Sequence, residues 1–261
     1  MEEIFQHFRK EEQQFIEQVS GWLREVEDRY SPKLTDFLDP RQRFIVEAVV
    51  GSSDVLLMAT GLFNDAERQR MLLYPSYYAP QLEDFNITVF ELKYPSKFVS
   101  LRHPDILGSL MSLGLDRSKF GDIRIDQGRV QLAVMNEISA YMQSNFINAA
   151  NVKVQLTEVL ERTDLIEISE EWFEESYTVS SMRLDTVMSS VYNISRQKAS
   201  ALIHGGKVKV NWTLQEQPSF ELHESDMISS RGYGRVRLIM IEGRTKKDKV
   251  RIQIGRLESK N

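Results

Sequence analysis

The most informative segment for the fold of the C-terminal part is Ser195–Asn211, which reads SRQKASALIHGGKVKVN. Its first half carries Ala199, Leu202 and Ile203 at helical spacing, behind a serine of the kind that caps helices. Its second half alternates like a strand, with valines facing inward and lysines outward. Two glycines between the halves allow a turn. The stretch therefore predicts a helix, a turn and a strand with one apolar and one basic side.

The charges of the chain divide at about residue 180. Residues 181–261 hold 15 basic and 8 acidic residues, a net charge of +7. The other 18 basic and 30 acidic residues lie in 1–180, a net charge of −12, which together give the total of −5. This asymmetry indicates a basic module attached to an acidic body, and a basic face favours polyanions.

The sequence around the opening stretch completes a longer pattern. RLDTVMSSVY at 183–192 predicts a preceding helix, and DMISSRG at 226–232 and KVRIQI at 249–254 lie downstream. Together these pieces resemble the S4 RNA-binding domain over about 70 residues, with many fixed spacings. The resemblance implies an RNA-binding surface made by two helices, the turn and the next strand (the αL motif). Its candidate contacts are Arg183, Ser195, Arg196, Lys198, Lys207, Lys209, Arg231 and Arg235.

Physical chemistry agrees with this assignment. Arginine offers a planar fork to a phosphate, and lysine offers a flexible point charge. The helix that begins near Ser195 adds backbone amides and a partial positive charge at its N-terminus. Such a surface suits the backbone and shape of a folded RNA. Asp185 of the RLD triplet is interpreted as structural, either capping the helix or pairing with a neighbouring basic residue.

Residues 81–165 predict the order β-α-β-β-α-β of a ferredoxin-like domain. The strands are expected at 86–94, 120–128, 129–135 and 152–159, and the helices at 104–115 and 136–146. RNA-recognition domains share this fold and carry stacking aromatics on the third strand. Here that strand reads RVQLAVM, so RNA binding by the sheet face is not expected.

The remaining segments give an α+β protein of four parts. Residues 1–80 form an α/β unit, with an amphipathic helix over 2–30, a helix opened by Asp39-Pro40 and a buried strand at 55–60. An acidic linker is expected at 166–180, between the ferredoxin-like domain and an S4 domain at 181–261. A loop holding Gly114, Arg117, Gly121 and Asp122 is a candidate second interaction surface.

The middle of the chain narrows the family. HPDILGSLMSLGLDRSKFGDI at 103–123, followed by an S4 domain, resembles the YlmH family of bacterial S4-domain proteins, encoded near cell-division genes. The resemblance implies binding to the large ribosomal subunit carrying peptidyl-tRNA, in ribosome-associated quality control of stalled translation. The partners expected from it are rRNA and, as a further candidate, tRNA. Periodicity and charge by themselves predict only that the protein binds RNA.

Catalysis finds little support in the residues. The chain has no cysteine, its four histidines are widely separated, and no GxGxxG loop exists. We therefore expect no catalytic residue, no metal and no cofactor. Two alternatives stay open, an RNA-modifying enzyme that uses the S4 domain as an anchor, and a cell-division accessory that binds a protein through the acidic part. Lacking an apolar span or signal-like N-terminus, the chain is expected to be cytoplasmic.

Overall fold

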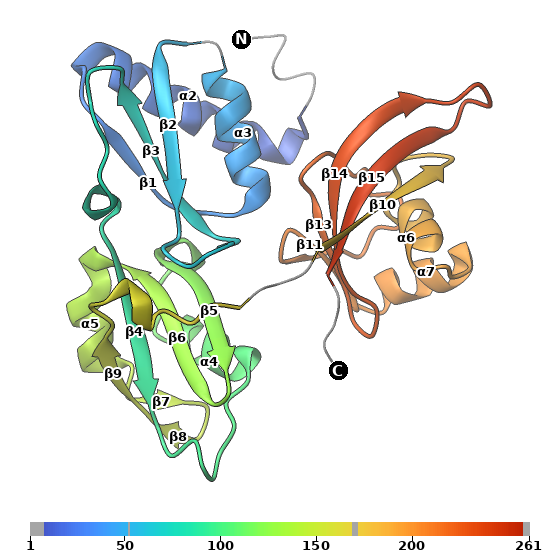
Figure 1. Cartoon of the computed structure of the whole chain (residues 1–261). Helices are drawn as coiled ribbons and strands as arrows, with labels where there is room; N and C mark the ends of the chain where they lie inside the picture. Colours follow the sequence, from blue (N-terminus) through green and yellow to red (C-terminus); the bar gives the residue numbers. More distant parts are fainter. Residues whose placement is uncertain (1–7, 52, 169–171, 258–261) are drawn as a thin grey trace. The chain divides into compact units, whose positions relative to one another are not determined.

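The computed structural model describes residues 8–51, 53–168 and 172–257 (Figure 1). The chain divides into two compact units, a first unit over residues 1–169 and a second unit over 170–261. Both units mix helices and strands, in agreement with the predicted α+β class. Among the described residues, no helix is both long and apolar enough to cross a membrane.

The N-terminal part of the first unit places two helices against a three-stranded antiparallel sheet. Val19 of one helix and Val46 of the other are buried with Leu73 of the central strand. The sheet has the order β1-β3-β2, and it includes two strands that the sequence did not predict. The elements are α2 (Gln13–Arg29), β1 (Lys33–Leu38), α3 (Pro40–Val50), β2 (Val55–Thr60) and β3 (Gln69–Pro75).

Two predictions for this part need correction. The helix expected over 2–30 begins at Gln13, after a 3-10 turn at Lys10–Glu12, and residues 1–7 lie outside the described part. The strand at 55–60 is only half-buried, because β2 is an edge strand of the sheet. The helix predicted from Asp39-Pro40 is confirmed. The Asp39 carboxylate accepts the Gln42 amide at 2.8 Å and caps α3.

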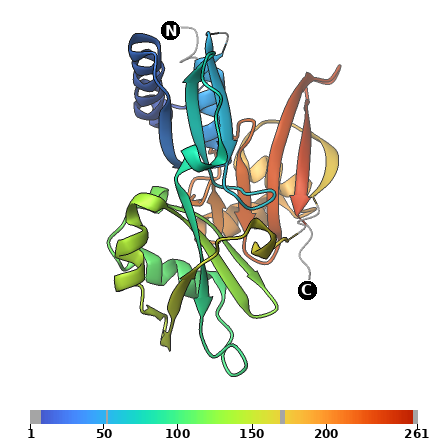
Figure 2. The ribbon, with the colours of Figure 1, turned by 60° about the vertical axis from the view of Figure 1, so that its left-hand side comes forward.

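The middle part of the first unit follows the predicted order of strands and helices. Its four-stranded sheet has the order β5-β6-β4-β9 with every neighbouring pair antiparallel, the order expected of a split βαβ unit. Helices α4 and α5 cover one face of it, where Ile106 and Met142 pack with Phe90 (Figure 2). The elements are β4 (Ile87–Lys93), α4 (His103–Met111), β5 (Phe120–Asp126), β6 (Arg129–Met135), α5 (Ser139–Asn145) and β9 (Gln155–Glu158).

The other face of this sheet is closed by the N-terminal part. Val89 and Ala133, which point away from α4 and α5, are buried against Phe37 and Phe63. RNA-recognition domains expose this face to stack bases on it. In the first unit the buried residues of the same face belong to a hydrophobic core, so they are not available to stack bases.

Buried arginines tie the two parts of the first unit together. The Arg68 guanidinium donates hydrogen bonds to the Phe37 carbonyl of β1 at 2.8 Å and to the Phe120 carbonyl of β5 at 3.1 Å. Burial lowers the pKa of Arg68, and nearby carboxylates oppose that effect. Three further arginines of the first unit are buried, namely Arg41, Arg70 and Arg124.

The second unit is a six-stranded sheet with two helices on one face. The strand order is β10-β15-β14-β13-β11-β12, and all pairs are antiparallel. Val187 and Ile203 of the helices pack with Val208 and Val236 of the sheet. The elements are β10 (Trp172–Val179), α6 (Leu184–Val191), α7 (Arg196–His204), β11 (Val208–Val210), β12 (Thr213–Leu214), β13 (Met227–Ser230), β14 (Gly234–Arg244) and β15 (Val250–Leu257).

The acidic stretch at 166–180, expected to be a linker, contributes a strand instead. Its residues Trp172–Val179 form β10, which pairs with β15 along its whole length. Two of the acids that suggested a linker have partners on β15, since Arg256 forms an ion pair with Glu175 at 3.1 Å and Gln253 donates to Glu174 at 2.7 Å. Opposite charges across a strand pair stabilise it, so the charge of Glu175 supports the pairing of β10 with β15.

Candidate nucleic-acid interface

A buried carboxylate organises two arginines at the start of α6. Asp185 is 2% exposed and accepts hydrogen bonds from Arg183 at 2.9 and 3.1 Å and from Arg196 at 3.0 Å. Burial opposes ionisation of Asp185, but these hydrogen bonds prevail and lower its pKa. The side chains of Arg183 and Arg196 remain 40% and 55% exposed. Asp185 thus fixes the orientation of both arginines while their remaining N–H donors face solvent.

The first turn of α7 lies next to an aromatic pair. Ser195 caps the helix by accepting the Lys198 amide at 3.1 Å, as predicted. The Lys198 ammonium lies 5.7 Å from the centre of the Tyr233 ring, which packs against Tyr192. We call Arg183, Ser195, Arg196 and Lys198 the helical face. These residues offer cations and the backbone amides of a helix N-terminus, which are groups that bind phosphates.

Two other candidates, Lys207 and Arg231, meet where the sheet ends. The Arg231 amide donates to the Lys207 carbonyl at 2.9 Å, and both residues are exposed. Lys207 follows the glycine turn after α7, and Gly206 adopts a φ of +64° there. Both therefore lie close to the C-terminal end of α7.

The structure separates the last two candidates from the helical face. Val208 and Val236 point into the core beneath the helices, and neighbouring residues of a strand point to opposite sides. Lys209 and Arg235 therefore lie on the sheet surface that faces away from α6 and α7. They share a row of that surface, because each is paired with Ser229 of β13. The predicted set is divided between two sides of the second unit.

The loop proposed as a second interaction surface has a structural role in the first unit. Arg117 donates to the Phe120 carbonyl at 2.6 Å, and burial lowers its pKa to about 10. The Asp122 carboxylate accepts the backbone amides of Glu67 and Arg68 at 2.8 and 3.0 Å. The Asp122 contacts join the middle part to the N-terminal part, and the Arg117 contact holds the end of the loop, so both side chains have structural roles.

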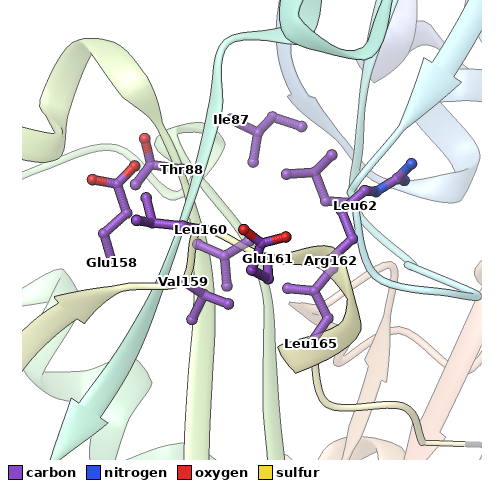
Figure 3. A pocket seen from close by; sticks show the side chains of 10 residues that line it. Leu62, Ile87, Thr88, Glu158, Val159, Leu160, Glu161, Arg162 and Leu165 are labelled. Atoms are coloured by element: carbon purple, nitrogen blue, oxygen red, sulfur yellow. The ribbon is translucent and has the colours of Figure 1, made fainter.

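A hollow of about 200 Å³ lies in the first unit, beside the segment that follows β9 (Figure 3). Figure 3 shows Leu62, Ile87 and Val159 pointing toward it. Its charged lining residues are all exposed and do not form a catalytic set; they are Glu158, Glu161 and Arg162. Among the described residues, no group of three or more histidines and carboxylates is placed to hold a metal ion.

Asp185 itself does not have the environment of a nucleophile. Its carboxylate is buried, both of its oxygens are engaged by arginines, and the Thr186 hydroxyl donates to it at 3.2 Å. A nucleophilic carboxylate must reach the reacting atom of a substrate. Of the two structural roles predicted for Asp185, capping and pairing, the structure shows pairing with arginines.

The sequence reasoning missed one basic feature, the turn between β14 and β15. Residues 244–251 read RTKKDKVR, with five basic residues and one acid. A run of this composition is itself a signal for polyanion binding, and it lies downstream of the segments that resemble the S4 domain.

Comparison with known proteins gives matches along most of the chain. Three family models match it, described as "YlmH, N-terminal" over residues 11–78, "Putative RNA-binding domain in YlmH" over 80–163 and "S4 domain" over 182–228. A Bacillus subtilis (strain 168) protein, "Ribosome-associated protein quality control protein P2", is 44% identical over 98% of this chain and 99% of its own length. The solved structure "Cell division protein ylmH from Streptococcus pneumoniae" is 32% identical, with a TM-score of 0.54 over 61% of this chain and 98% of that one.

Proposed function

Because this chain belongs to the YlmH family of S4-domain proteins, we propose that it docks structured ribosomal RNA through its helical face. The observation that carries the proposal is the pair of arginines held by Asp185. Arginines fixed in advance lose little entropy when they bind a phosphate, so they favour one arrangement of the RNA backbone. The role is non-enzymatic: the residues recognise an RNA and position the protein on it.

The proposed setting is the large ribosomal subunit during quality control of stalled translation. It is supported by the name of the Bacillus subtilis relative, which describes that protein as ribosome-associated. We extend the proposal to tRNA as a second partner. On that view, large subunits that carry peptidyl-tRNA bind the protein more tightly than vacant subunits, which a sedimentation assay with both preparations measures. Equal binding would remove tRNA from the proposal.

The test is the double variant Lys198→Ala, Lys207→Ala, which removes one cation of the helical face and the cation that follows the C-terminal end of α7. Both side chains are exposed, and within the described part of the chain neither ammonium group has a hydrogen bond or an ion pair, so the fold should be unaffected. We expect weaker binding to deproteinised large-subunit rRNA. The binding constant is measured at salt concentrations from about 50 to about 300 mM, the range over which phosphate contacts depend strongly on salt. The slope of log K against log salt should become shallower by about 0.7 to 0.9 for each lost phosphate contact.

A matched control removes two cations from the first unit, in the variant Lys10→Ala, Arg24→Ala. Both residues are exposed; Lys10 lies in the 3-10 turn that precedes α2, and Arg24 lies on α2. The control changes the net charge by the same amount, so a helical-face effect is one that exceeds the control. If both variants bind rRNA as the wild type does, the helical face is not the docking surface.

A further inference from the structure

The turn between β14 and β15 holds three lysines whose charges are not compensated locally. Lys246, Lys247 and Lys249 are exposed, and their ammonium groups have no recorded partner among the described residues. The acid of the turn, Asp248, forms an ion pair with Arg244 at 2.6 Å. We call Arg244–Lys249 the hairpin tip. It presents an excess of positive charge to solvent.

The hairpin tip has a defined backbone rather than a loose one. The Thr245 amide donates to the Lys249 carbonyl at 2.7 Å, and the Asp248 amide donates back to the Thr245 carbonyl at 2.9 Å. Asp248 has a φ of +56°, a left-handed conformation that aspartate and asparagine tolerate better than most residues. The three lysines are therefore carried on a closed turn at the end of a paired hairpin.

This hairpin extends beyond the central strands of the sheet. β13 pairs only with Gly234–Arg237 of β14, whereas β14 and β15 remain paired as far as Arg244 and Val250 (Figure 1). The tip is thus carried past the end of β13. A protruding turn of this kind can reach into a groove that a flat sheet surface cannot enter.

The tip lies at the same end of the second unit as the arginines held by Asp185. Val179, the last residue of β10, is paired with Val250 at the base of the tip. Arg183 follows Val179 by four residues, a span of at most about 14 Å for an extended chain. Arg183 therefore lies close to the base of the tip, and a single folded polyanion can contact both sites.

We infer that the hairpin tip is a second RNA contact, which binds the phosphate backbone of a folded RNA that also occupies the helical face. Lysine ammonium groups bind phosphates as point charges, and the tip carries no aromatic ring on which a base could stack. The contact is therefore independent of base sequence and adds affinity and orientation. It lies outside the segment matched by the S4 model, residues 182–228, and rests on the RNA binding proposed above.

The test is the full-length variant Lys246→Ala, Lys247→Ala, Lys249→Ala. If all three lysines contact phosphates, the slope of log K against log salt becomes shallower by about 2 to 3, and the affinity at 0.1 M salt falls by up to about 100-fold. The control Lys10→Ala, Arg24→Ala, Arg29→Ala removes the same charge from η1 (Lys10–Glu12) and α2 and should have a much smaller effect. An unchanged slope in the tip variant overturns the inference.

A second variant tests the same contact in the opposite direction. Asp248→Asn removes the acid of the tip and frees Arg244 while keeping a residue that tolerates the left-handed backbone. We expect RNA binding to become about fivefold tighter at 0.1 M salt, as for one added phosphate contact. Binding that stays equal or weakens contradicts the inference.

The two proposals fail in different ways. If the tip variant binds rRNA like the wild type while Lys198→Ala, Lys207→Ala weakens binding, only the tip contact is wrong. If both keep the wild-type slope, RNA docking by the second unit is wrong. If the tip variant binds rRNA normally but sediments less with intact subunits, the tip contacts a ribosomal protein, and the inference of an RNA contact is also overturned.

Discussion

The two units bury opposite charges. Among the described residues, the buried charged side chains of the first unit are all arginines, and those of the second unit are the aspartates Asp185 and Asp226. A buried arginine donates hydrogen bonds to acceptors around it, as Arg68 does to two backbone carbonyls. A buried aspartate accepts from cations that remain outside, as Asp185 does.

This difference explains how one chain has an acidic part and a basic part without unpaired buried charge. A buried ion must be matched by hydrogen bonds or by an opposite charge. Each unit places in its interior the sign of charge that is scarce on its surface. The first unit has acids on its surface. The second unit has exposed cations, two of which are oriented by the buried Asp185.

The largest effect on stability is expected for Arg68→Ala, which removes a buried charge of the first unit. Two backbone carbonyls lose a charged donor and the N-terminal part loses a tie to the middle part, so the free energy of unfolding of the first unit should fall by about 3 to 5 kcal/mol. Urea titration followed by circular dichroism measures it. The exposed Arg162→Ala should change stability by less than about 0.5 kcal/mol. A loss below about 1 kcal/mol for Arg68→Ala would mean that its burial is incidental.

The next effect concerns Asp185→Asn. The change removes a negative charge, which alone would favour RNA, but it releases two arginines from a fixed orientation. We expect rRNA binding to weaken about fivefold, equivalent to about 1 kcal/mol, as measured by fluorescence anisotropy. Asp248→Asn changes the charge equally and should tighten binding, so the two variants separate orientation from charge. Tighter rRNA binding by Asp185→Asn would mean that net charge, and not the orientation of the arginines, determines the affinity.

The smallest effect concerns Glu91, a partly exposed carboxylate of the first unit. Burial opposes its ionisation, but hydrogen bonds from Arg129, Lys93 and Gln131 lower its pKa to about 2. Because its pKa in the folded protein lies below the ordinary value of 4.5, the ionised group stabilises the fold above that pH, and this is lost as the pH falls toward 2. Glu91→Gln should cost about 1 kcal/mol or less at pH 7. Its deficit should shrink in urea titrations between about pH 4.5 and pH 2, and a deficit independent of pH would contradict this assignment.

Local patterns were sufficient to predict much of the second unit. The serine cap, the helical spacing of Ala199 and Ile203 and the glycine turn each depend on neighbours in sequence, and each is found. A structural role for Asp185, as a cap or as a partner of a nearby basic residue, was also predicted, and the structure shows the pairing with Arg183. That it holds Arg196 as well depends on how two helices pack, which no local pattern encodes.

What the sequence did not predict depends on distant partners. β1 and β3 lack a clean alternation, because β3 is central and buried on most of its length. Glu174 and Glu175 suggested a linker because their partners on β15 are about 80 residues away. Lys209 and Arg235 were grouped with the helical face because they are basic, although strand alternation places them on the other side of the sheet.

The pairing of β10 with β15 also bears on how this protein is made. β10 is the first strand of the second unit to be synthesised, but its neighbour in the sheet is β15, more than 70 residues later. The first unit precedes β10 in the chain, and domains made earlier fold first. β10 has no strand partner among the described residues until β15 has been translated, and contacts so distant in sequence slow folding. The basic unit is therefore expected to assemble after the first unit.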